Sequence, residues 1–175
     1  MQLQKSVIHT ARAVCLMLAI CTPALSQTAV PPVADTVSLS GPRFGFTVLS
    51  DGIVKTLKTE GVNVGPAMTQ FGWQFEKQFY SGPNGPTAVT EAVLLFGGLE
   101  QGLALPSLSW LAGVRTKNGS EFGVGPNVTP VGVALVVSAG MTFQVGVLNV
   151  PLNVAVVPSR SGVRVSVLSG FNVRR

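Results

Sequence analysis

Apolar and polar residues alternate with a period of two along most of residues 41–175. In residues 67–80, for example, Phe71, Trp73 and Phe75 are separated by single polar or glycine residues. Successive side chains of a β-strand point to opposite faces, so this pattern predicts strands with one apolar and one polar face. We count eight such candidate strands. One of them, residues 87–99, is apolar on both faces, so its facing stays ambiguous.

Short breaks separate the candidate strands, and they favour antiparallel neighbours joined as a meander. Asn118-Gly119 is a strong hairpin signal, and residues 81–86 and 158–162 are rich in turn-forming residues. Residues 51–60 differ, because Ile53, Val54 and Leu57 recur at helical spacing. The sequence therefore predicts an all-β fold: an antiparallel meander barrel of about eight strands, with one short helix in the first connection.

The first 26 residues have the pattern of a secretory signal peptide. Lys5 and Arg12 precede an apolar segment at residues 13–21, and small residues stand before Gln27. The apolar segment is about half the ~20 residues that a membrane-spanning helix needs. A lipoprotein site at Cys21 is the alternative. We expect a signal peptide at 1–26, a flexible leader at 27–40 and a β-barrel domain at 41–175.

The charge content decides which barrel face we expect to meet water. Only 11% of the residues are charged, whereas a soluble globular protein carries about 25%. Glycine, serine, glutamine and asparagine dominate the polar face, which suits a narrow barrel interior better than a water-facing surface. We expect a polar network inside the barrel, formed by Arg43, Glu76, Arg115, Glu121 and Arg164. We expect lipid-facing aromatic side chains on the outside at Phe71, Trp73, Phe75, Trp110 and Phe143.

A signal peptide followed by about eight amphipathic strands resembles the small bacterial outer-membrane β-barrel proteins. The resemblance is one of architecture and covers residues 41–175. It implies a location in the bacterial outer membrane and membrane lipid as the partner. The alternative is a soluble periplasmic or secreted barrel that binds an apolar ligand inside.

The sequence lacks the residues that most catalytic sites require. Both cysteines, Cys15 and Cys21, and the single histidine, His9, lie in the expected signal peptide. The remaining carboxylates have no spacing typical of a catalytic pair or a metal site, so we expect no enzymatic activity, no metal and no cofactor. The basic residues are scattered, which argues against nucleic-acid binding. The specific role, structural or in the interaction with a small solute, and any protein partner are not indicated.

Overall fold

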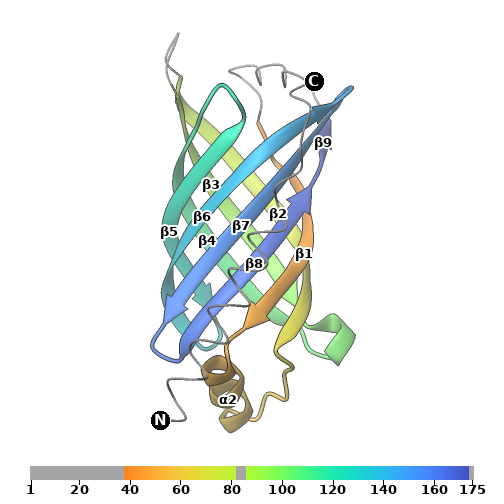
Figure 1. The fold of residues 1–175 in the computed structure, drawn as a ribbon, viewed down its shortest axis with the longest axis vertical. Coiled ribbons are helices and arrows are strands. Elements are labelled where there is room, and N and C mark those ends of the chain that lie inside the picture. Colours follow the sequence, from red (N-terminus) through yellow and green to blue (C-terminus); the bar gives the residue numbers. More distant parts are fainter. Residues whose placement is uncertain (1–37, 82–85, 174–175) are drawn as a thin grey trace, which may run out of the picture. The chain divides into compact units, whose positions relative to one another are not determined.

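The computed structural model describes residues 38–81 and 86–173, and these form one closed β-barrel (Figure 1). The expected signal peptide and nearly all of the expected leader lie outside the described residues. The eight barrel strands are β1 (Gly41–Leu49), β2 (Ala67–Ser81), β3 (Thr87–Gly97), β4 (Leu105–Arg115), β5 (Ser120–Thr129), β6 (Gly132–Val145), β7 (Leu148–Ser159) and β8 (Gly162–Gly170).

Each barrel strand pairs antiparallel with the next one in the chain, and β1 also pairs with β8, which closes the sheet. A short strand β9 (Asn172–Val173) adds to one end of β7. Two helical segments interrupt the meander: α2 (Asp51–Thr59) between β1 and β2, and the 3-10 turn η1 (Leu99–Gln101) between β3 and β4. The predicted barrel with one short helix in its first connection is confirmed.

Burial alternates along the strands, and β3 shows the pattern most clearly. Every second residue from Thr87 to Gly97 is buried, and the residues between them are only partly buried. The facing that the sequence left ambiguous is therefore resolved: Val89, Val93 and Leu95 point into the barrel. β3 is apolar on both faces in the sequence because these inward-facing residues are apolar as well as the outward-facing ones.

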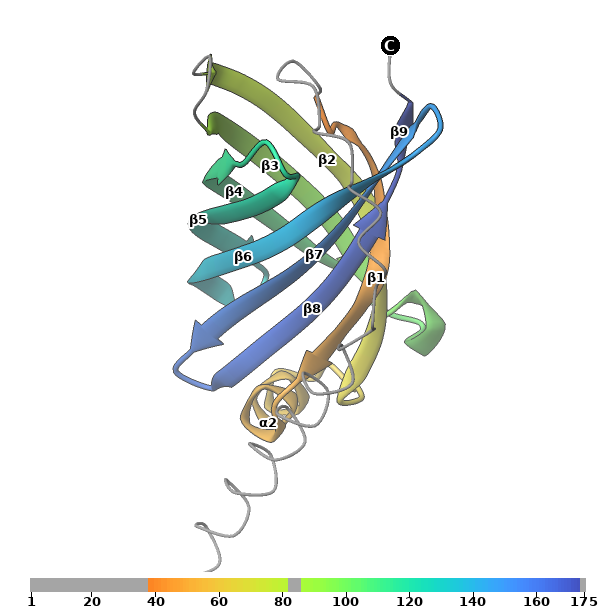
Figure 2. The same cartoon turned by 45° about the horizontal axis from the view of Figure 1, so that its top comes forward.

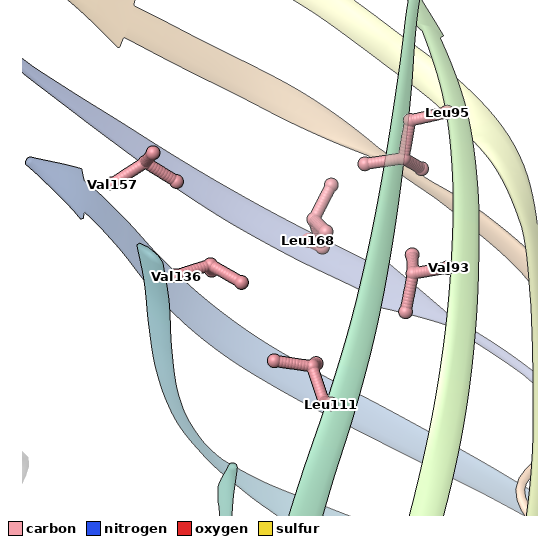
Figure 3. Close-up of a cluster of buried hydrophobic side chains, with 6 residues drawn as sticks. All are labelled: Val93, Leu95, Leu111, Val136, Val157 and Leu168. Atoms are coloured by element: carbon pink, nitrogen blue, oxygen red, sulfur yellow. The ribbon is translucent and has the colours of Figure 1, made fainter. Parts of the chain in front are cut away.

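An apolar layer crosses the barrel interior, so the lumen is not polar throughout as the sequence predicted. Its buried side chains point toward one another from five strands (Figure 3). They are Val93, Leu95, Leu111, Val136, Val157 and Leu168. Packing of this layer narrows the middle of the barrel and contributes hydrophobic stabilisation from inside.

Inward-facing glycines let neighbouring strands approach closely. A methyl group at Gly72 would lie 1.9 Å from the carbonyl oxygen of Leu94, and one at Gly45 would lie 1.9 Å from that of Val167. Any larger residue would have to push two strands apart. These glycines therefore serve a narrow barrel whose strands coil strongly.

Helix α2 lies at the end of the barrel where β1 ends and β2 begins (Figure 2). Leu57 is its buried residue and packs in a cluster with Leu49, Val64 and Met68. Ser50, just before the helix, bonds β8 twice: its amide donates to the Val163 carbonyl oxygen at 3.0 Å, and its hydroxyl accepts from the Val163 amide at 3.0 Å. The helix is thus fixed to the barrel by apolar packing and by hydrogen bonds.

No helix in the described part of the chain is both long and apolar enough to span a membrane.

Candidate functional site

A cluster of buried charges occupies the barrel interior around Arg115. Its guanidinium group donates from Nε to Glu121 Oε2 at 2.7 Å and from Nη1 to Glu76 Oε1 at 2.8 Å, and Nη2 also reaches both carboxylates. Arg115 and Glu121 are only 4% and 5% exposed. Strand pairing accounts for the arrangement, because Arg115 lies directly opposite Glu121 across β4 and β5. Three of the five residues of the predicted lumen network therefore meet in one ion-paired group.

Glu91 is a further member of this cluster, and the sequence analysis did not place it there. It is 3% exposed and lies opposite Glu76 in the pairing of β2 with β3. Its Oε1 atom is buried and has no hydrogen-bond partner. The sequence shows Glu91 only as a single carboxylate within an apolar segment. The pairing of neighbouring strands brings it close to the carboxylates of Glu76 and Glu121.

Carboxylate oxygens of Glu76, Glu91 and Glu121 lie within 4.8 Å of one another. The sequence predicted no metal site, because these residues are far apart along the chain. Oxygen donors at this spacing are of the type that hard divalent cations prefer. The Arg115 guanidinium already neutralises two of the three, however, and a cation would have to displace it. The geometry thus describes a structural ion cluster rather than an open coordination site.

Arg43 borders this cluster and ties it to the start of the described chain. Its Nε donates to Gln74 Oε1 at 3.0 Å, and its Nη2 donates to the Leu39 carbonyl oxygen at 2.7 Å. It also lies within electrostatic range of the three glutamates. Leu39, in the last part of the expected leader, is 1% exposed. The described end of that leader is therefore held against the barrel.

Arg164 lies apart from the other predicted network residues. Its Nη2 donates to Asn127 Oδ1, and Asn127 in turn donates from Nδ2 to the hydroxyls of Ser107 and Ser109 at 2.8 Å each. Both ion pairs found among the described residues belong to Arg115. The structure thus divides the predicted network into an ion cluster and a separate arginine–asparagine pair.

The five aromatic side chains that the sequence assigns to the outside all lie on the outer surface. Trp110 is 62% exposed and Phe75 58%, and Phe71, Trp73 and Phe143 are also exposed. Many aliphatic side chains share this surface, among them Val133 and Leu135 of β6. The outer surface of the barrel is therefore strongly apolar. That these side chains face lipid stays a prediction.

Two cavities lie one behind the other along the barrel interior. The lumen cavity, lined in part by Glu91 and Leu111, has a volume of about 40 Å³. The second cavity, which we call the mouth, has a volume of about 750 Å³ and opens at the α2 end. Asn127, Val157 and Arg164 line both cavities. These three residues therefore form the partition between the lumen and the mouth.

Comparison with models of known protein families found no match, and neither did comparisons with curated proteins and with solved structures.

Proposed function

We propose that this β-barrel protein is a non-enzymatic protein of the bacterial outer membrane, with a closed lumen and membrane lipid around its outer surface. The observation that carries the proposal is the distribution of polarity across the barrel wall. Charged side chains such as Arg115 and Glu121 are buried inside, whereas Trp110 and Phe75 are more than half exposed outside. Soluble monomers rarely expose contiguous apolar patches beyond a few hundred Å². A lipid bilayer is the medium in which this outer surface is stable.

Strand length supports the same proposal. Strands that cross a bilayer at a tilt need about 9–11 residues. The eight barrel strands have between 9 and 15 residues. Closure of the sheet through β1 and β8 also gives the described strands a neighbour on both sides over most of their length, as a lipid environment requires.

The packed lumen argues against two other roles. A cavity of about 40 Å³ holds no more than a few water molecules. It has no room for an apolar ligand of the kind that a soluble ligand-binding barrel encloses, for which pockets of about 300–1,000 Å³ are usual. The apolar layer of Figure 3 lines the same small cavity, and a space of this size is too narrow for a solute pore. The ion cluster therefore serves to hold the strands together, and the proposed role is structural rather than that of a pore.

The test uses the two tryptophans of the chain, Trp73 and Trp110, as reporters of the surrounding medium. The protein is reconstituted in phosphatidylcholine vesicles with or without bromine on the acyl chains. We expect brominated chains to quench the fluorescence of both tryptophans, since both side chains lie on the outer surface. Iodide in the aqueous phase should quench neither of them.

The variants Trp73→Phe and Trp110→Phe leave one tryptophan each and serve as matched controls. Quenching by iodide but not by brominated lipid would refute the membrane location. So would recovery of the protein from cells as a soluble monomer that needs no detergent.

A further inference from the structure

The mouth is a cavity built by three separate parts of the chain at one end of the barrel. Ile53, Thr56 and Leu57 of α2 form one side. The connection between β5 and β6, with Val131, and the connection between β7 and β8, with Ser161, form the other two sides. Its volume of about 750 Å³ lies within the ~300–1,000 Å³ that is typical of small-ligand sites.

The floor of the mouth carries a positive charge without a carboxylate partner among the described residues. Arg164 is partly buried, and the hydrogen bond that the structure gives its side chain runs to the neutral Asn127. Among the described residues, no carboxylate lies within electrostatic range of the Arg164 guanidinium. Arg115 and Arg43, in contrast, both lie within electrostatic range of glutamates. A guanidinium has five N–H donors. Each Arg164 nitrogen either makes a hydrogen bond or keeps some accessible surface. Arg164 lines the mouth as well as the lumen cavity, so the donors that Asn127 does not engage are the groups it can offer to a ligand.

The rest of the lining combines a second arginine with apolar side chains. Arg160 lies in the connection between β7 and β8 and adds another positive charge. Ile53, Leu57 and Val157 contribute apolar surface. A ligand that matches this lining has an anionic head group and an apolar chain.

We propose that the mouth binds a single-chain carboxylate amphiphile of the fatty-acid type. The carboxylate accepts hydrogen bonds from Arg164, in the planar two-point geometry that guanidinium and carboxylate groups share. The chain extends along Leu57 and Ile53 of α2 toward Val131. The lumen itself stays closed, because the Arg164–Asn127 partition stands between the mouth and the lumen cavity.

The experiment is photolabelling of the purified full-length protein in nonionic detergent. The probe is a palmitic acid analogue that carries a diazirine on its chain, and the matching alcohol is the uncharged comparison. Labelled peptides are quantified by mass spectrometry for residues 129–134 and 157–164, which line the mouth. Peptides from the outer surface around Trp73 give the reference for nonspecific contact with apolar molecules.

We expect the acid to label the mouth peptides, relative to the outer reference, about tenfold more than the alcohol does, because the charge-assisted hydrogen bond depends on the carboxylate. Arg164→Gln should remove that difference. The matched control is Lys58→Gln, which removes an equal charge from the exposed side of α2 and should leave the difference unchanged.

Thr56→Trp is a second variant that fills the mouth from α2 without any change of charge. It should reduce labelling of the mouth peptides by both probes. If Arg164→Gln does not fold, this variant tests whether the labelled site is the mouth. Equal labelling by acid and alcohol in the parent protein would overturn the proposal. So would an acid preference that survives Arg164→Gln, or mouth labelling that persists in Thr56→Trp. None of these readouts depends on where the protein resides, so the proposed membrane location is tested separately.

Discussion

At the scale of single residues, Glu91 and Glu121 share one charge cluster but differ in what holds them. Glu121 accepts hydrogen bonds from Arg115 at 2.7 Å and 2.6 Å. Glu91 is just as deeply buried, yet one of its oxygens has no hydrogen-bond partner. Burying a polar atom without a partner is costly, whereas a charge-assisted hydrogen bond is among the stronger ones in proteins. The same substitution should therefore lower the free energy of unfolding much more at Glu121 than at Glu91.

We predict that Glu121→Gln lowers the free energy of unfolding by about 1.5–3 kcal/mol, the usual contribution of a hydrogen bond to a charged group. Glu91→Gln should change the free energy by less than about 1 kcal/mol, because Arg115 donates its hydrogen bonds to Glu121 and Glu76 and the substitution at Glu91 removes none of them. The measurement is urea unfolding in lipid vesicles, followed by tryptophan fluorescence. An equal loss in both variants would mean that Glu91 contributes to the ion-paired group as much as Glu121 does.

At the scale of elements, the connection between β3 and β4 is fastened to β2 by two side chains of η1. Glu100 accepts hydrogen bonds from the Thr69 amide at 2.9 Å and from the Thr69 hydroxyl. Gln101 Oε1 accepts from the Gly65 amide at 2.7 Å, and its Nε2 donates to the Ala67 carbonyl oxygen at 2.7 Å. The bonds from the hydroxyl and the amide of Thr69 favour the charged carboxylate and lower the pKa of Glu100 to about 2.

This lowered pKa predicts how the connection responds to acid. A carboxylate whose pKa is lower in the folded state stabilises the fold fully above its ordinary value of 4.5, and the contribution disappears as the pH falls toward 2. The protection factor of the Thr69 amide in hydrogen exchange should therefore fall across that range. In Glu100→Gln it should be lower and nearly constant. Glu60→Gln, on the exposed side of α2, is the control, and a loss of pH dependence in that variant as well would contradict the assignment to Glu100.

At the scale of the whole barrel, the two ends differ in the length of their connections. An even number of barrel strands brings the start of β1 and the end of β8 to the same end, and α2 lies at the opposite one (Figure 1). At the α2 end, the connections 50–66 and 98–104 are long and the connections 130–131 and 160–161 are short, whereas the fully described connections at the other end, 116–119 and 146–147, are both short. Membrane barrels have short periplasmic turns and longer loops outside the cell. In the proposed outer-membrane location, we therefore expect the α2 end to face outward.

This orientation predicts the outcome of labelling in intact cells with a maleimide that does not cross membranes. A cysteine in place of Thr59, which is exposed at the end of α2, should be labelled at once. A cysteine in place of Asn118, in the turn between β4 and β5, should be labelled only after the outer membrane is made permeable. The reverse result would mean that the barrel has the opposite orientation. Labelling of both positions in intact cells would contradict a periplasmic location of the turn between β4 and β5.

The strands, their alternation and the helical exception at α2 could be predicted from the sequence because they depend on local information. A side chain's face in a strand follows from its position along the chain alone. Alternation put Phe71, Trp73 and Phe75 on one face of their strand, and the composition of the opposite face assigned the aromatic face to the outside. The helical spacing of Leu57 likewise predicted the buried side of α2.

Only the tertiary structure decided which inward-facing side chains meet. Contact between Arg115, Glu121 and Glu76 depends on strand register and on closure of the barrel, which are properties of the whole sheet. Alternation could not separate Arg164 from that group or bring Glu91 into it, since every second residue of a strand faces the same lumen. The mouth required still more: α2 and two distant connections had to converge on one end of the barrel. Its chemistry therefore exists only after the strands have closed.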